Sequence, residues 1–336
     1  MSFVSALSVV PMASRWSTTS ALLGILFVGF YIGFARCAYT KYYIHVGVMV
    51  DGAHQQQTPN LQANQAYYRT LFMAVARRLS LLGAGYFKIS FIIHPLSQTE
   101  TNEVFARVGQ PALVENLYKN VIFFIKAHSN VFNYKKELLV LTTRRVLKTQ
   151  NGALSKGFAV KGSICTPNSI AVVRDDGTFA AVNEVVKLIL HTVGVDFDGV
   201  GKASNCPAHE GYLMGTGKLK LPLGYSLCTK RLVGAALRRS QCLGNKISNK
   251  TTKRIPIPAK IKRGVYCSWF GLSECDEKGM AKFEHKAASK YHCLVHCCKG
   301  HSRMERMVAP DGLRCDEDPF SYYDKRCVNG ACVQIR

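Results

Sequence analysis

Apolar residues in the first part of the chain follow two spacings, one typical of strands and one typical of helices. Residues 42–51 alternate and then become continuously apolar, which predicts a buried strand. Residues 67–82 place apolar side chains three and four positions apart, which predicts a helix. Residues 87–94 alternate again and stop at Pro95, so we expect a second strand there.

The middle of the chain repeats these patterns and closes with a very apolar segment. Residues 111–126 predict a helix that starts at its proline, and residues 138–143 predict a short buried strand. Residues 169–177 predict a strand followed by an Asp-Gly turn. Residues 179–193 carry apolar side chains nearly all round a helix, so this helix belongs in a core. Packing alone would hold it in place, with or without a metal.

Length and composition indicate a secreted protein with one substantial core and a smaller module. The chain has 336 residues, 48% of them hydrophobic, and 13 cysteines, too many for a cytosolic chain unless they bind metal. The apolar segment 21–34 follows Arg15 and predicts a signal peptide over residues 1–37, cleaved after Cys37. An uncleaved anchor is the alternative. Because the apolar segment is short for a bilayer span, we expect no stable membrane span and an extracellular protein.

Cleavage after Cys37 would leave an even number of cysteines, which favours full pairing. They are Cys165, Cys206, Cys228, Cys242, Cys267, Cys275, Cys293, Cys297, Cys298, Cys315, Cys327 and Cys332. The last eight alone allow on the order of 100 pairings, so the sequence does not choose among them. The tail spacings form no paired C-x-x-C knuckles, which disfavours a metal site in the tail.

Basic residues outnumber acidic ones and gather in one acid-free stretch. The chain has 44 Lys and Arg against 21 Asp and Glu, a net charge of +23, and no acidic residue lies between Glu210 and Glu274. Within this stretch residues 247–264 contain two prolines and predict an exposed linker, with a glycosylation sequon at Asn249. Its candidate anion-binding cations are Lys250, Lys253, Arg254, Lys260, Lys262 and Arg263.

Two interpretations of this basic stretch stay open. It is either a solvated surface that aids solubility, or an anion-binding strip for sulfated glycans, acidic proteins or anionic lipid heads, whose attraction weakens as salt rises. No stacking aromatic side chains interleave the cations, and the chain is rich in disulfide-type cysteines. We therefore expect no nucleic-acid partner.

Residues 187–198 read Lys-Leu-Ile-Leu-His-Thr-Val-Gly-Val-Asp-Phe-Asp, which looks like a zinc-protease helix without its chemistry. The pattern H-E-x-x-H-x-x-G-x-x-H supplies zinc-binding imidazoles and a general-base glutamate, with a methionine turn downstream. Gly194 aligns with the motif glycine. The remaining positions then fall, in motif order, on Lys187 (first ligand), Leu188 (glutamate), His191 (second ligand), Phe197 (third ligand) and Met214 (methionine turn).

Only one ligand position of this motif keeps a metal-binding side chain. A catalytic zinc needs three protein ligands and a carboxylate that accepts the proton of the bound water. Leu188 cannot accept a proton, Phe197 cannot bind a metal, and the Lys187 ammonium would repel a divalent cation. The simple interpretation of His191 is a hydrogen-bonded helix histidine. As a hypothesis, the ammonium replaces part of the zinc charge and the phenyl ring fills the space of the metal.

Neighbouring side chains offer no clear substitute site. Glu184 would lie about 10 Å along the helix axis from His191, too far to share a metal. Asp196, Asp198 and His209 follow the glycine turn, and we expect Asp198 to pair with a nearby cation. No Gly-x-Ser-x-Gly nucleophile motif is present. The sequence therefore assigns no catalytic residue and no cofactor.

Residues 42–242 as a whole resemble the reprolysin (adamalysin-type) metzincin metalloprotease domain, in the divergent form found among tick salivary proteins, with a degenerate zinc motif. The resemblance implies an edge strand at residues 158–166, along which a peptide would lie in an active member. It also implies the disulfides Cys165–Cys242 and Cys206–Cys228. Residues 293–298, 309–315 and 326–332 resemble the Cys-rich region that follows reprolysin domains. Such a region would bind partners, or serve only as structure.

The sequence thus predicts an α+β chain, in which a metzincin-like domain with a mixed twisted sheet packed on long helices precedes a small disulfide-rich module. Its expected parts are a signal peptide (1–37), the metalloprotease-like domain (38–246), the basic linker (247–264) and the Cys-rich domain (265–336). We expect a secreted, catalytically inactive homologue that binds host extracellular or haemostatic proteins or sulfated glycans. The alternative is a zinc metalloendopeptidase that cleaves extracellular proteins through a non-standard site.

Overall fold

The computed structural model describes most of the chain after the first forty residues. The described ranges are 42–52, 61–83, 87–132, 137–177, 179, 181–216, 223–244, 262–268, 272–275, 293–299, 303–315 and 324–335. The expected signal peptide, the sequon at Asn249 and four of the linker cations, Lys250, Lys253, Arg254 and Lys260, lie outside these ranges. None of the described helices combines the length and the apolar character that crossing a membrane requires.

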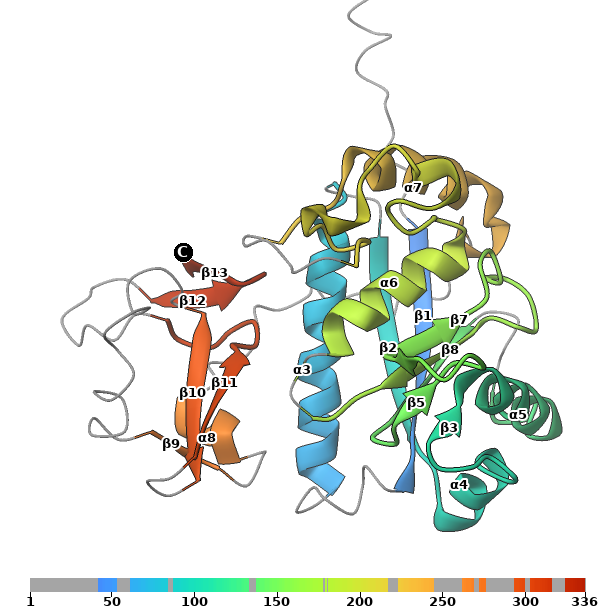
Figure 1. Ribbon diagram of the computed structural model, residues 1–336, viewed down its shortest axis with the longest axis horizontal. Helices are drawn as coiled ribbons and strands as arrows, with labels where there is room; N and C mark the ends of the chain where they lie inside the picture. The colour runs from blue at the N-terminus through green and yellow to red at the C-terminus, as the bar shows by residue number, and fades with distance from the viewer. Residues whose placement is uncertain are drawn as a thin grey trace, which may run out of the picture. The chain divides into compact units, whose positions relative to one another are not determined.

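A mixed sheet forms the centre of the first module (Figure 1), and its strands lie in the order β2-β1-β4-β8-β7. The first four are parallel and the last is antiparallel, at the edge. Their bounds are Phe87–Pro95 (β2), Tyr42–Val50 (β1), Glu137–Thr143 (β4), Ile170–Arg174 (β8) and Gly157–Ala159 (β7). The predicted α+β class with a mixed sheet is therefore confirmed.

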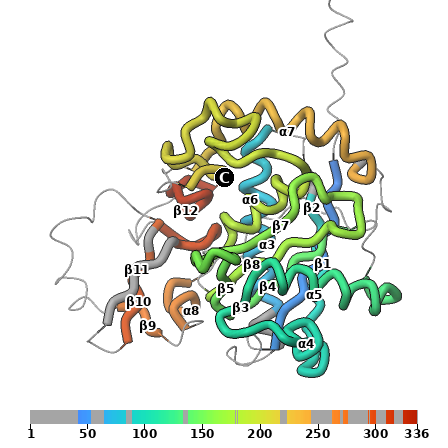
Figure 2. The backbone as a smooth tube through the Cα atoms, turned by 45° about the vertical axis from the view of Figure 1, so that its right-hand side comes forward, coloured from blue at the N-terminus to red at the C-terminus, as the bar shows by residue number. Residues whose placement is uncertain are grey.

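Helices cover both faces of this sheet because the strands bury both sets of alternating side chains (Figure 2). Val46 and Val48 of β1 pack with α3 (Leu61–Ser80) and α6 (Ala181–Val193). Met49 points to the opposite core, which contains the buried residues of α4 (Gln98–Val104) and α5 (Val114–Ala127). α6 therefore lies in one of two dense apolar layers.

Smaller elements complete the described chain. Short strands β3 (Ala112–Leu113), β5 (Leu147–Lys148) and β6 (Leu154–Ser155) pair in the order β3-β5-β6. After α6 come η1 (Gly201–Ala203), η2 (Ala208–Glu210), α7 (Leu227–Arg239) and η3 (Gln241–Gly244). The tail contains α8 (Arg263–Ser268), β9 (Ser273–Glu274), β10 (Leu294–Lys299), β11 (Arg303–Val308), β12 (Lys325–Val328) and β13 (Ala331–Gln334).

Three predicted elements differ from the structure. The helix expected over residues 67–82 extends from Leu61 to Ser80. The helix expected from residue 111 begins at Val114, because the Ala112 N–H donates to the Val146 carbonyl and residues 112–113 pair with β5. The edge strand expected over residues 158–166 ends at Ala159. Beyond Ala159 the chain turns at Gly162, whose φ is +69°. The backbone N–H groups of Gly162 and Ile164 donate to carbonyls at the end of α6 instead of continuing the sheet.

Six disulfides cross-link the described chain and use every cysteine after Cys37. The structure joins Cys165 with Cys242 and Cys206 with Cys228, the two pairs that the resemblance implies. The tail pairs, which the sequence left open, are Cys267–Cys297, Cys275–Cys298, Cys293–Cys327 and Cys315–Cys332. Such a disulfide framework is typical of proteins that fold in an oxidising compartment.

Candidate functional site

The degenerate motif lies on the second half of α6 and the turn that follows. Gly194 ends this helix with φ +109°, a left-handed conformation that favours glycine. The loop after β7 caps the helix, because Gly162 N–H donates to the His191 carbonyl and Ile164 N–H donates to the Thr192 carbonyl. The last turn of α6 is therefore held by backbone hydrogen bonds and needs no metal.

Lys187 occupies the first ligand position and is half-buried. Its Nζ donates a hydrogen bond of 2.7 Å to the carbonyl oxygen of Gly215, directly after the fully buried Met214. Gly215 itself is closely packed, since a Cβ atom there would lie 2.3 Å from the Ala208 carbonyl oxygen. The ammonium thus connects α6 to the methionine-containing turn, and it places a positive charge where the motif would supply a neutral imidazole.

Leu188 occupies the position of the general-base glutamate and is 3% exposed. It lies against the edge strand, where a Cβ atom on Gly157 would stand 2.8 Å from Leu188 Cδ1. The side chain therefore packs α6 against β7. It offers no atom that could accept a proton.

His191 and Phe197 occupy the second and third ligand positions and contact each other. Their rings stack at a centroid distance of 4.4 Å and an interplanar angle of 20°. His191 Nδ1 lies 3.2 Å from the Val195 carbonyl oxygen, so this nitrogen carries the proton. Burial lowers the pKa of His191, which favours the neutral ring at neutral pH. The imidazole is therefore a stacked, hydrogen-bonded histidine.

The two aspartates after the glycine turn have separate structural partners. Asp196 forms an ion pair with Lys161. Asp198 accepts hydrogen bonds from the hydroxyls of Ser226, at 2.6 Å, and Thr229, at 3.3 Å. The prediction that Asp198 pairs with a nearby cation is therefore wrong. Ser226 is the N-cap residue of α7, so this carboxylate anchors the start of that helix instead.

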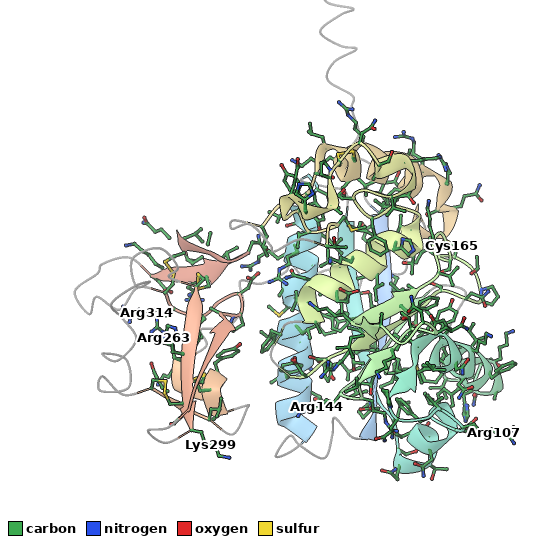
Figure 3. The ribbon with its side chains drawn as sticks, viewed as in Figure 1. Arg107, Arg144, Cys165, Arg263, Lys299 and Arg314 are labelled. Carbon is green, nitrogen blue, oxygen red and sulfur yellow. A yellow bond between two sulfur atoms is a disulfide. The ribbon has the colours of Figure 1, made fainter. Side chains whose placement is uncertain are left out.

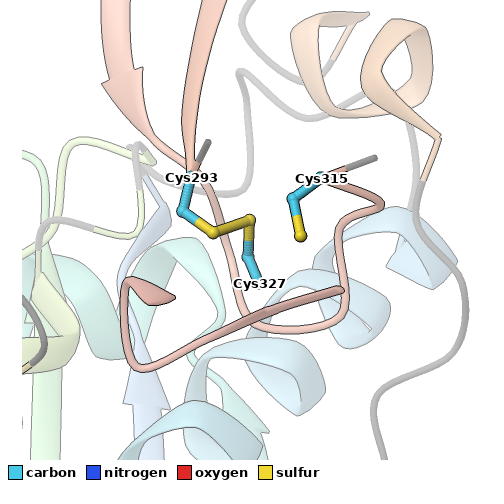
Figure 4. Close-up of side chains that lie close together, drawn as sticks. All are labelled: Cys293, Cys315 and Cys327. Carbon is cyan, nitrogen blue, oxygen red and sulfur yellow. A yellow bond between two sulfur atoms is a disulfide. The ribbon is translucent and has the colours of Figure 1, made fainter. Parts of the chain in front are cut away.

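The described residues contain one group of three close metal-ligand side chains, and it lies away from this motif. The Sγ atoms of Cys293, Cys315 and Cys327 lie within 4.8 Å of one another (Figure 4). Cys293 is bonded to Cys327, and Cys315 is bonded to Cys332. Sulfurs in disulfides are not thiolates and do not ligate metals. Among these residues, no such group includes His191.

The last two linker cations lie in the described part of the chain. Lys262 is exposed. Arg263, labelled in Figure 3, is partly buried, and burial lowers its pKa while the nearby Glu274 carboxylate acts in the opposite direction. This acid neutralises part of the charge that the sequence assigned to an anion-binding strip.

A second group of cations lies in the same acid-free stretch, outside the predicted linker. Lys230, Arg231, Arg238 and Arg239 all lie on α7, and all four are exposed. Residues 230, 231 and 238 recur at helical spacing and share one face. The helical spacing of these cations is the sequence signal that places them on one face of α7.

Comparisons with known proteins give the chain no family. The sequence matches no protein-family model and no curated protein. Among solved structures, metalloproteinase-II from Bacteroides fragilis is similar at 12% identity and a TM-score of 0.42, over 62% of this chain and 55% of that one. A chaperone–substrate complex is similar at 10% identity and a TM-score of 0.40, over 61% of this chain and 36% of that one. At these TM-scores neither likeness defines a shared activity.

Proposed function

We propose that the protein is a secreted, catalytically inactive homologue of the reprolysin-type metzincin metalloproteases, and that it acts by binding an extracellular partner. The partner is a host extracellular or haemostatic protein, or a sulfated glycan. The observation that carries the proposal is the hydrogen bond from the Lys187 ammonium to the Gly215 carbonyl, at the first ligand position of the motif. The six disulfides support the extracellular location.

Three of the four zinc and general-base positions of the motif carry a side chain that cannot fulfil its role. Lys187 brings a charge that opposes metal binding, and Phe197 brings a ring without a donor atom. Leu188 is packed against β7 and cannot take the proton of a metal-bound water. A protein with this set of residues keeps the helix of the motif and loses the reaction.

Retention of the fold without metal follows from the same contacts. The Lys187 ammonium supplies part of the positive charge that a zinc ion would bring, and the Phe197 ring fills the space beside His191 that the metal would occupy. Nine residues of α6 are buried, so the helix is held by packing, and its last carbonyls are capped by the loop after β7. The surface of such a scaffold stays available for binding.

The test measures zinc content and peptide hydrolysis together, on secreted protein with its disulfides intact. Wild type should contain far less than one zinc per chain and should not cleave peptides. The triple variant K187H/L188E/F197H restores the motif and should bind stoichiometric zinc. Because Leu188→Glu places a carboxylate in a buried site, the double variant K187H/F197H tests metal binding without that penalty.

A matched control places the same three changes on the surface. F123H/L154E/K230H alters a phenylalanine that is 69% exposed, a leucine that is 72% exposed and an exposed lysine on another helix, so the two new histidines do not form an i, i+4 pair. It should bind no more zinc than wild type. Chelator-sensitive cleavage by wild type would refute the proposal, and so would failure of both motif variants to bind zinc while folded.

A further inference from the structure

α7 presents a row of cations on its solvent side. We call Lys230, Arg231 and Arg238 the α7 cationic stripe; all three are exposed. Positions 230, 231, 234 and 238 fall on one face of a helix with 3.6 residues per turn. Gly234 lies between the cations and carries no side chain. Figures 1 and 2 show α7 crossing beside one end of the sheet.

No acid among the residues that the structure describes neutralises the stripe. Within the described residues, Lys230, Arg231 and Arg238 form no ion pair. α7 contains no acidic residue, and the sequence between Glu210 and Glu274 contains none. Unpaired cations side by side repel one another, so a ligand that brings negative charges relieves this repulsion.

Helix stability does not explain the arrangement. Arg238 lies in the last turn, where a cation interacts favourably with the helix dipole. Lys230 and Arg231 are the fourth and fifth residues of α7, where the helix dipole gives a cation no stabilisation and no acidic residue of the helix pairs with it. The interaction with the dipole therefore accounts for only one of the three cations.

The helix that bears the stripe is firmly anchored. Cys228 is bonded to Cys206, and Ser226 caps the first turn and donates to Asp198. Thr229, Val233, Ala236 and Leu237 of the same helix are buried. A rigid array of charges loses less entropy on binding than the same charges on a flexible segment would.

We propose that the α7 cationic stripe binds a linear sulfated polysaccharide. The stripe runs about 12 Å from residue 230 to residue 238, at about 1.5 Å per residue, so an extended chain can bring several sulfates to it. Arginine guanidinium groups bind sulfate and phosphate oxygens through paired N–H donors. The Arg238 side chain extends back along the helix toward the other two cations, since a Cβ atom on Gly234 would lie 3.7 Å from Arg238 Nη1. This inference names the partner class left open above, and it rests on that proposal only for the extracellular location.

The test measures binding of the full secreted protein to immobilised heparin at two salt concentrations. Wild type should bind, and more weakly as salt rises, because screening shortens the reach of exposed charges to about 8 Å at physiological ionic strength. Loss of one cation–sulfate contact should lower the affinity for heparin about fivefold, so the variant K230Q/R231Q/R238Q, which loses three, should bind on the order of 100-fold more weakly. Desulfated heparin should bind weakly to both proteins.

A control variant separates the stripe from overall charge. R107Q/K119Q/K126Q removes three other exposed cations that form no ion pair in the described part of the chain. It should bind heparin within about twofold of wild type if the stripe is the site, because distant exposed charges are screened. Equal losses in the two variants would overturn the inference, and so would stripe-dependent binding to phosphatidylserine vesicles without binding to heparin.

Failure of this inference is distinguishable from failure of the proposed function. If wild type does not bind heparin and also lacks zinc and peptidase activity, the proposal of an inactive scaffold stands and the assignment of a glycan site to the stripe is refuted. If wild type cleaves peptides and binds heparin, and K230Q/R231Q/R238Q does not bind heparin, the proposal of an inactive scaffold is refuted and the assignment of the stripe stands.

Discussion

Replacement of Lys187 by methionine isolates the contribution of its ammonium group. Methionine keeps most of the length and the helix propensity of lysine, so the change removes the bond to the Gly215 carbonyl and the attraction between the ammonium and the nearby Glu184 carboxylate. A hydrogen bond from a charged group is worth about 1.5–3 kcal/mol, and Lys187 is only half-buried, which allows water to replace part of it. We expect the free energy of unfolding to fall by about 1–2 kcal/mol.

The assay is urea unfolding followed by near-ultraviolet circular dichroism, with the disulfides kept oxidised. In a thermal unfolding experiment, each kcal/mol lost should lower the Tm by roughly 2–4 °C for a domain of this size. Lys230→Met is the control, because Lys230 is an exposed lysine in a helix and should change stability by less than about 0.5 kcal/mol. Equal stability of Lys187→Met and wild type would show that the ammonium does not hold α6 to the methionine turn.

Two further outcomes follow from the same site. Burial lowers the pKa of His191 in the folded protein, so folding disfavours its protonation, and the free energy of unfolding should decrease as pH falls from 7.5 through the ordinary histidine value of 6.5. His191→Gln should flatten part of this decrease in urea titrations at several pH values, and an unchanged slope would contradict the assignment. Gly215→Ala should cost about 1–3 kcal/mol, because its Cβ would lie 2.3 Å from the Ala208 carbonyl oxygen. Gly224→Ala, where nothing lies within 4 Å, is its comparison, and equal effects would argue against the close packing.

The sequence located the buried strands well because their apolar runs have a clear period. β1 and β4 begin and end within one residue of the predicted ranges, and β8 begins at Ile170 and ends at Arg174, directly before the predicted turn. α5 was placed three residues early, because its expected first residues bond to Val146 and Lys148, and no local pattern reveals such a distant partner. The expected edge strand was too long because the chain after Ala159 serves as the cap of α6.

The candidate site was predictable by residue type and not by contact. Motif alignment identified Lys187, Leu188, His191 and Phe197, yet the acceptor of the Lys187 ammonium lies 28 residues away in sequence. Charge alone suggested a cation for Asp198, whereas the structure supplies two hydroxyl groups from the start of α7. Spacing reveals which side chains share a helix face, and it does not reveal which loop returns to meet them.

The paired contacts around α6 also constrain how this sequence can change. Lys187 is bonded to Gly215, and Phe197 is stacked on His191, so each contact has two halves. A single substitution toward a metal-binding set breaks one contact and gains no complete ligand set in return. A lineage that carries these residues would have to pass through less stable intermediates to regain a metal centre, so selection for stability alone opposes the return.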